Sequence, residues 1–207
     1  MNLQMPKKSK FDLLRESERE ARKAILLDTA VHLFAERPYH EISMRTIADA
    51  AEVSAASIYR YFPSREDLLV AALERDLDVM EVRLGEHLDS GEASLRSFAV
   101  AAIDHLVDNE ATFQMICHFM VRGEMNPDAL DKFNELQRLL LEKWDDVLRK
   151  AGTVGIDRFF AHTFVASLIG IVMSYRNYPG RDEAEKRAYM YELAELLCRK
   201  LSGGEGG

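Results

Sequence analysis

The sequence predicts an all-α protein in which an amino-terminal group of three helices is joined by one long helix to a larger helical body. Glycine and proline are scarce, at 11 and 5 of 207 residues, so the segments between helix-breaking residues are long. Apolar residues recur at helical spacing along these segments. No segment alternates apolar and polar residues for long enough to predict a sheet.

The composition is that of a folded chain. Apolar residues make up 47% and charged residues 30%, which is enough to bury a core and fits one large or two modest domains. Four segments are predicted: a flexible basic tail at 1–16, a three-helix domain at 17–75, a helical body at 76–201 and a flexible tail at 202–207.

The first predicted helix runs from about Ser17 to Glu36. Its apolar face should pack over the segment that follows, and it consists of Ile25, Leu26, Ala30, Leu33 and Phe34. Pro38 ends the helix because proline cannot continue the hydrogen-bond ladder. Ahead of the helix, three lysines in the tail could add contacts to phosphates, although a solvated terminus explains them equally well.

A helix-turn-helix is predicted from Ser43 to Arg65, the segment SMRTIADAAEVSAASIYRYFPSR. Ile47 and Ala51 fall on one helical face, Val53 occupies the turn, and Ile58, Tyr61 and Phe62 recur at helical spacing. The two short helices can therefore share one small apolar seam. Pro63 limits the second helix to about two turns, because the residue before a proline is pushed toward extended geometry. A helix of that length can lie in a major groove.

Serines mark the starts of the helices in this segment. Ser43 precedes the first, Ser54 the second and Ser64 the third, and a serine hydroxyl accepts a hydrogen bond from a first-turn amide. Asp67, three residues after Ser64, completes a capping box.

The second helix opens with small, uncharged residues, followed by hydroxyl and guanidinium groups that can donate to base edges and phosphates. No acidic residue lies between Ser54 and Arg65. The predicted DNA-binding residues are Ser43, Arg45, Ser54, Ala55, Ala56, Ser57, Tyr59, Arg60, Tyr61 and Arg65.

The segment ISMRTIADAAEVSAASIYRYFPSREDLL, with AILLDTAVHLFAERPYHEIS upstream, resembles the DNA-binding segment of the tetracycline-repressor (TetR) family of bacterial regulators. An Ile-Ala pair, a Val-Ser turn, a Tyr-x-Tyr/His-Phe run and a basic residue opening the fourth helix recur in that family. The resemblance covers roughly residues 20 to 75, and beyond them the chain matches in length and helical character. It implies a DNA-binding dimer whose body takes a small effector.

Two positions depart from the family pattern. Glu52 stands where many members have glycine, at a turn that asks for a left-handed backbone, where a Cβ costs roughly 1 to 2 kcal/mol. Ala55 and Ala56 stand where relatives often place base-contacting side chains, and alanine offers an apolar contact, for example to a thymine methyl. We therefore expect base readout to rest on Arg45, Ser57 and Tyr59, with DNA shape supplying more.

The net charge of -8 opposes nucleic-acid binding until its distribution is considered. Basic and acidic residues balance over residues 1–75, so the excess negative charge lies in the body. Residues 1–23 hold seven basic and four acidic residues. A basic arm beside the helix-turn-helix can bind phosphates in a salt-dependent way, while the acidic body stays off the DNA.

A long helix is predicted from Ser64 to about Leu88, starting in the three-helix domain and ending in the body. A shared element of this kind can transmit a tilt from one domain to the other. The body helices are predicted at Ser94–Asp108, Glu110–Val121, Pro127–Lys150, Ile156–Tyr175 and Asp182–Leu201.

Apolar rows in the body are consistent either with a ligand pocket or with an ordinary core that contains one satisfied amide. Gln137 is a polar residue in one such row. The family resemblance implies a pocket for a small, mostly apolar effector. The candidate lining residues are His105, Phe113, Cys117, Met120, Gln137 and Trp144.

Small residues recur every four positions in the penultimate helix, at Ala166, Gly170 and Ser174, which lets a neighbouring helix approach closely. The last two helices of two chains would then form a four-helix interface, and packing within one chain is the alternative. The candidate interface residues are Phe164, Ala166, Gly170, Ser174, Tyr191, Ala194 and Leu197. A two-fold dimer places its heads on half-sites one helical turn of DNA apart, or a multiple of it.

Catalytic and metal signatures are absent from the sequence. It has no phosphate-cradling glycine loop, nucleophile elbow or Cys-x-x-Cys. No histidine has Glu three positions earlier, as di-iron bundles require, although Cys117, His118 and His162 could approach one another. We predict no enzyme activity, no cofactor and no bound metal.

The cysteines and the apolar segments indicate a cytoplasmic protein. Cys117 and Cys198 lie far apart in apolar helical patterns, which favours reduced thiols over a disulfide. The first residues are polar and basic, unlike a signal peptide. The longest mostly apolar run, Phe164 to Met173, is about half a membrane span.

Together these features predict a ligand-responsive transcriptional regulator, a repressor that binds a near-palindromic operator as a homodimer and is released by a small, mostly apolar effector. Its partners would be double-stranded DNA, the effector and a second copy of the chain, with no membrane. The alternative is a helical-bundle carrier or binding protein that has a helix-turn-helix only as an element of its fold.

Overall fold

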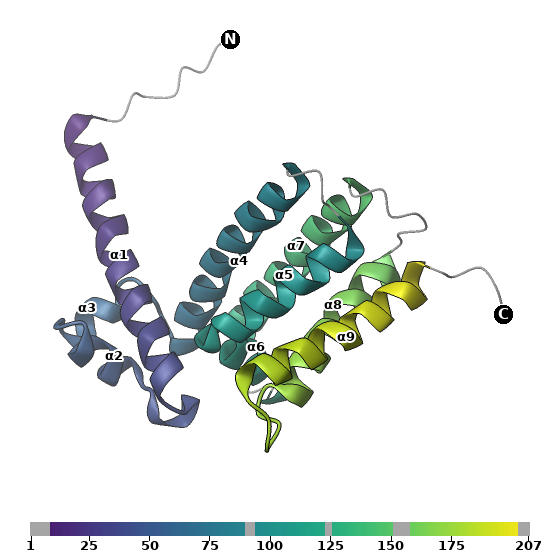
Figure 1. Cartoon of the computed structure of the whole chain (residues 1–207). Helices are drawn as coiled ribbons and strands as arrows, with labels where there is room; N and C mark the ends of the chain where they lie inside the picture. The colour runs from purple at the N-terminus through teal and green to yellow at the C-terminus, as the bar shows by residue number, and fades with distance from the viewer. Residues whose placement is uncertain (1–8, 90–93, 123–125, 151–157, 203–207) are drawn as a thin grey trace, which may run out of the picture. The chain divides into compact units, whose positions relative to one another are not determined.

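The computed structural model of the chain describes residues 9–89, 94–122, 126–150 and 158–202. Over these residues it contains nine α-helices, one short 3₁₀ turn and no strand (Figure 1), so the predicted all-α class is confirmed. The chain divides into two compact units, Met1–Ala71 and Ala72–Gly207, which we call the head and the body.

Three helices and the start of a fourth form the head. These are α1 (Lys10–Glu36), α2 (Met44–Ala50), α3 (Ala55–Tyr59) and the first turns of α4 (Arg65–Asp89), with the 3₁₀ turn η1 (Tyr39–Glu41) between α1 and α2. Side chains from all four helices meet in one apolar core. Its most buried members are Ala30, Phe34, Ile42, Ile47, Ala48, Ile58, Leu68 and Leu69.

The first helix differs from the prediction in two ways. It begins at Lys10 rather than near Ser17, because Ser9 and Asp12 form a capping box that starts the helix early. Residues 10–16 are therefore helical, and residues 1–8 of the predicted tail lie outside the described residues. Ile25 was expected in the core, but its side chain is 56% exposed, and Leu27 is buried instead.

The predicted caps of the helix-turn-helix are confirmed. The Ser43 hydroxyl accepts from the Thr46 amide at 3.1 Å, and the Ser54 hydroxyl accepts from the Ser57 amide at 3.2 Å. At the start of α4 the Asp67 amide donates to the Ser64 hydroxyl at 3.0 Å, and that hydroxyl donates to the Asp67 carboxylate. These local bonds satisfy amides that have no partner within their helix.

The turn between α2 and α3 places Glu52 in the left-handed backbone region, with φ of 56°. This confirms the predicted left-handed backbone at the turn. Glycine adopts this conformation without steric strain, whereas a residue with a Cβ adopts it at a cost in free energy. The turn is held by the amide of Val53, which donates to the Ala48 carbonyl at 2.9 Å.

The remainder of α4 and five further helices form the body, close to their predicted bounds. They are α5 (Leu95–Asp108), α6 (Glu110–Arg122), α7 (Pro127–Lys150), α8 (Arg158–Tyr175) and α9 (Glu183–Ser202). Figure 1 shows α8 and α9 side by side in the body. The predicted start of the fourth body helix, Ile156, lies outside the described residues.

The body is organised around the ring of Trp144, which is 2% exposed. Phe98 from α5 and Phe164 from α8 meet this ring edge-on, at centroid distances of 6.5 and 5.6 Å. Edge-to-face pairs add to the free energy that burial alone supplies. Polar contacts tie α9 to α5, because Arg187 donates to Asp104 at 2.6 Å and to Asp108 at 2.7 Å.

The positive φ at Glu52 leads to a stability prediction. The Glu52→Gly variant should stabilise the head by about 0.5 to 1 kcal/mol, since removal of the Cβ relieves backbone strain but leaves a more flexible unfolded chain. Amide hydrogen exchange of peptides from α2 and α3 would measure the change. The Glu52→Ala variant is the control, because it removes the charge and keeps the Cβ. Equal protection in both variants would show that strain is not the cause.

Candidate nucleic-acid interface and body cavity

The second and third helices present an exposed polar surface on the head. Arg45, Ala55, Ala56, Tyr59 and Arg60 are all exposed, and Tyr59 retains 53% of its accessible surface. With this exposure the Tyr59 ring contributes little to the core of the head. The side chain of its neighbour, Ile58, is fully buried. The surface therefore offers hydroxyl and guanidinium donors around two alanines that allow close approach.

The hydroxyl groups on this surface are partly engaged in local hydrogen bonds. Ser54 and Ser57 lie 2.9 Å apart through their Oγ atoms, and Ser43 and Thr46 pair at 3.3 Å. A serine hydroxyl can still accept or donate one further bond in such a pair. Arg45 and Tyr59 are exposed residues of the predicted set that do not belong to these hydroxyl pairs.

Arginines from the first helix join this surface. Arg15, Arg19 and Arg22 on α1 line a groove together with Glu18 and with Arg60 and Tyr61 at the end of α3, and we call it the arginine groove. Their spacing places them on one face of α1. The guanidinium of Arg60 lies 5.3 Å from the centre of the Tyr61 ring, and Arg22 pairs with Glu18 at 2.6 Å.

Sequence reasoning missed the three arginines of α1 as site residues. It placed the first of them in a flexible tail and did not use the spacing of the other two. The excess of basic residues over residues 1–23 was the available signal. It pointed to the right segment, but the groove exists because α1 begins at Lys10 and extends past the end of α3.

Arg65 was predicted to contact DNA, and in the structure its half-buried guanidinium also makes contacts within the head. It donates to the carbonyl oxygens of Ile42 at 2.6 Å and Tyr39 at 3.2 Å, and it lies 3.9 Å from the centre of the Tyr39 ring. Burial raises the pKa of Tyr39 to about 12, so the phenol stays neutral beneath the cation. In this position Arg65 binds the turn before α2 to the start of α4.

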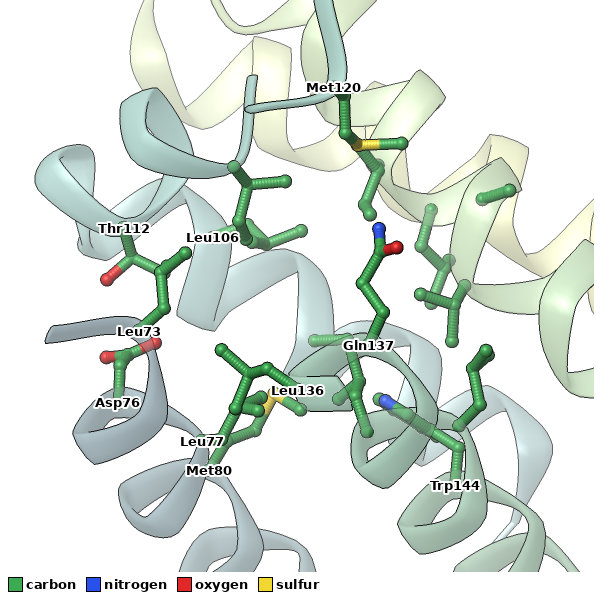
Figure 2. Close-up of a pocket in the computed structure, with 18 of the residues that line it drawn as sticks. Leu73, Asp76, Leu77, Met80, Leu106, Thr112, Met120, Leu136, Gln137 and Trp144 are labelled. Carbon is green, nitrogen blue, oxygen red and sulfur yellow. The ribbon is translucent and has the colours of Figure 1, made fainter. Parts of the chain in front are cut away.

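The body contains a cavity of about 430 Å³ lined by residues of α4, α5, α6, α7 and α8 (Figure 2). Its walls are mainly apolar, as in pockets for small molecules. Four of the six predicted pocket residues line it: His105, Met120, Gln137 and Trp144. The other two lie elsewhere on α6. Phe113 is buried in the core with the guanidinium of Arg176 5.0 Å from its ring, and Cys117 packs against the same core.

A buried histidine pairs with a carboxylate in the cavity wall. The Nε2 atom of His105, which is 2% exposed, lies 2.7 Å from Oδ2 of Asp76 on α4. Its Nδ1 atom faces the side-chain amide of Asn109 at 3.4 Å. This hydrogen bond connects α4 to α5. His105 was predicted to line the pocket and Asp76 was not, because in the sequence Asp76 is one of several acidic residues of a long helix.

The predicted interface residues divide into buried and exposed groups. Phe164 and Ala194 are buried in the core of one chain, and Leu197 packs against that core. The hydroxyl of Tyr191 donates to Asp104 within the same chain. Ala166, Gly170 and Ser174 are exposed on α8, where nothing within 4 Å would meet a Cβ at Gly170. The exposed group is the part of the prediction that a second chain can reach.

Known proteins match the chain most clearly over the head. Residues 26–72 match the family of bacterial regulatory proteins, tetR family. The HTH-type transcriptional repressor KstR of Mycobacterium tuberculosis is 39% identical over 120 residues, covering 57% of this chain and 53% of KstR. Alignments with the first curated relatives span 34% to 53% of the length of those proteins.

Two solved structures share the fold over most of the chain. FadR from Bacillus halodurans, a fatty acid degradation regulator, has a TM-score of 0.66 at 20% identity and covers 88% of this chain and 99% of its own. FadR from Bacillus subtilis, solved with stearoyl-CoA, has a TM-score of 0.61 at 21% identity, with 84% and 97% covered. At such identities the likeness concerns the fold.

The head is thus a helix-turn-helix domain of the kind that binds DNA, attached to a helical body that contains a cavity. Residues 26–72 of this head match the family of bacterial regulatory proteins, tetR family, which confirms the resemblance seen in its sequence. Among the helices that the structure describes, none is long and apolar enough to cross a membrane.

The half-buried position of Arg65 leads to a prediction that distinguishes a role in the stability of the head from a role in DNA contact. The Arg65→Gln variant should destabilise the head by about 2 kcal/mol, because it leaves two carbonyls without a charged donor. The Arg60→Gln variant, on the exposed surface, should change stability by less than about 0.5 kcal/mol. Proteolysis in urea, with cleavage sites mapped to the head, would measure both. Equal resistance of the two variants would contradict the structural role of Arg65.

Proposed function

We propose that this protein is a ligand-responsive transcriptional repressor that binds a near-palindromic DNA operator as a homodimer. The observation that carries the proposal is the exposed surface of α2 and α3, where Arg45, Tyr59 and Arg60 project from a capped helix-turn-helix. The exposed side chains of Arg45, Tyr59 and Arg60 can reach base edges when α3 enters the major groove. The repressor KstR, 39% identical over 120 residues, supports this direction of regulation.

The arginine groove adds contacts to the DNA backbone in this proposal. Three guanidinium groups on α1 lie beside Arg60, and phosphate oxygens accept from arginine in a bidentate geometry. Such contacts position the protein on DNA and carry no sequence information directly. They also add positive charge beside the helix-turn-helix in a chain whose net charge is -8.

The body cavity is the proposed effector site. Its volume and apolar walls suit a small molecule with few polar groups, and the related fold of FadR holds stearoyl-CoA. The chain acts in this view by binding, without catalysis. An effector can weaken DNA binding only by the difference between its affinities for the DNA-competent and the DNA-incompetent shapes of the protein.

A two-fold dimer is part of the proposal because one head reads a single half-site. The exposed small residues of α8, Ala166, Gly170 and Ser174, let a helix of a second chain approach closely. Joining α8 and α9 of two chains would make a four-helix interface and set the distance between the heads.

A carrier that merely retains the helix-turn-helix fold is the competing function. It requires no exposed aromatic or cationic side chains on α3, whereas the structure exposes Tyr59 and Arg60 there.

Substitution of two exposed residues that are predicted to contact bases, Arg45 and Tyr59, tests DNA binding. Duplexes bound by the wild-type protein would first be selected from a random pool. The double variant Arg45→Ala with Tyr59→Ala should bind the selected site about 100-fold more weakly by fluorescence anisotropy, since each good base contact contributes about 1 to 3 kcal/mol. Its thermal unfolding should match that of the wild type. A pool without an enriched symmetric site, or undiminished binding by the variant, would contradict the proposal.

The arginine groove predicts a change in salt dependence. Replacing Arg15, Arg19 and Arg22 by alanine should reduce the slope of log affinity against log salt concentration by about 2 to 3, because each phosphate contact releases counterions. The preferred sequence should stay the same. The matched control replaces Arg149, Lys150 and Arg199 of the body by alanine and removes the same charge. Equal slopes in the two triple variants would show that net charge, and not the groove, is responsible.

A further inference from the structure

Apart from Gln137 of α7, the polar residues that line the body cavity fall into two groups. Asp76, His105 and Thr112 come from α4, α5 and α6, and His105 and Thr112 are buried. Figure 2 shows Asp76 and Thr112 together at one side of the cavity, with Gln137 and Trp144 across from them. The second group is exposed and consists of Asn134, Arg138 and His162. We call the first group the inner polar end and the second the mouth.

Hydrogen bonds within the inner polar end leave it rich in acceptors. One nitrogen of His105 is occupied by Asp76 at 2.7 Å, and the other faces the amide of Asn109. Neither ring nitrogen therefore offers its proton to a bound molecule. An ionised carboxylate has two oxygens and about four sites that accept a hydrogen bond, and His105 uses one of them. The remaining sites on the Asp76 carboxylate can only accept hydrogen bonds.

The charges around the cavity also favour a hydrogen-bond donor over an anion at the inner polar end. Among the described residues that line it, Arg138 is the one arginine or lysine, and it belongs to the exposed mouth. Asp76 is the one carboxylate, and its side chain is 19% exposed. In a weakly hydrated site an anion is repelled by this carboxylate, whereas a donor bound to it forms a charge-assisted hydrogen bond.

The space between the two groups is mainly apolar, with the amide of Gln137 as the polar group in its wall. Leu73, Leu77 and Met80 of α4 face Leu136, Leu140 and Trp144 of α7 around it, and α8 contributes Val165 and Ile169. A molecule that fills this space gains free energy in proportion to the apolar surface that it buries. Its polar atoms must then find partners at one end, because an unpaired polar group in such a space is costly.

We propose that the effector is a mostly apolar molecule with a single polar end that donates a hydrogen bond, namely an alcohol or a protonated amine, and that this end binds Asp76. Thr112 lies beside the same end and can accept or donate one bond. The apolar part extends between α4, α7 and α8 toward the mouth. This inference rests on the proposed function and specifies the chemical class of the effector. It excludes a carboxylate placed at the inner polar end.

Binding of matched ligands tests the class of the polar end. The chain has one tryptophan, Trp144, which lines the cavity, so its fluorescence reports occupancy. The full chain would be titrated with decanol, decylamine and decanoate below their aggregation limits. Decanol and decylamine should bind roughly tenfold to a hundredfold more tightly than decanoate, as expected for a charge-assisted hydrogen bond. Decanoate binding as tightly as decanol, both in the wild type and in an Arg138→Gln variant that removes the cation of the mouth, would overturn the proposal.

Substitution of the carboxylate assigns the preference to a residue. The Asp76→Asn variant keeps the size of the side chain and an oxygen that can accept from His105, and it removes the charge. It should lose at least about tenfold in affinity for decylamine and bind decanoate no more weakly than the wild type. The Asp78→Asn variant is the matched control, because Asp78 is an exposed carboxylate on the same helix. An unchanged ligand order in Asp76→Asn would overturn the assignment.

Two further measurements keep the outcomes distinct. Should Asp76→Asn fail to fold by circular dichroism, the Thr112→Val variant replaces it, and its affinity for decanol should fall relative to decylamine. DNA binding without ligand is measured on the selected duplex. Binding of that duplex without a preference for donor ligands refutes the present inference alone. A donor preference without DNA binding refutes the repressor proposal and leaves the cavity chemistry standing.

Discussion

One unbroken helix constrains this protein, because α4 belongs to both units. Its first turn is bound in the head by Arg65, which donates to the carbonyls of Ile42 and Tyr39. Further along, Asp76 binds His105 on α5, and Lys143 of α7 pairs with Glu81. Backbone hydrogen bonds run along α4, so the residues bound in the head and those bound in the body belong to one helix.

The contact between Asp76 and His105 has two roles for this reason. It ties α4 to the body, and it forms part of the wall of the cavity. A molecule that binds Asp76 therefore acts on the helix that enters the head. Its regulatory effect is limited to the free-energy difference between the shapes of the protein that it distinguishes, as linkage requires.

The candidate sites show where reasoning from the sequence succeeds and where it stops. Tyr59 and Arg60 could be assigned to a surface because helical periodicity separates them from Ile58, which is fully buried. The role of Arg65 could not be assigned, because its partners are carbonyl groups more than twenty residues earlier in the chain. Phe113 follows the same periodicity as true cavity residues, and side-chain packing against Arg176 decides its place.

By itself the sequence determined the helix-turn-helix, its serine caps, the bounds of most helices and the likeness to TetR regulators. These follow from contacts between residues three or four positions apart, which leave a readable local pattern. Tertiary structure alone decided that the arginines of α1 meet Arg60 and that Asp76 meets His105. Both contacts join segments that are distant in the chain. The direction of a long side chain depends on how the helices pack, which the local sequence pattern does not determine.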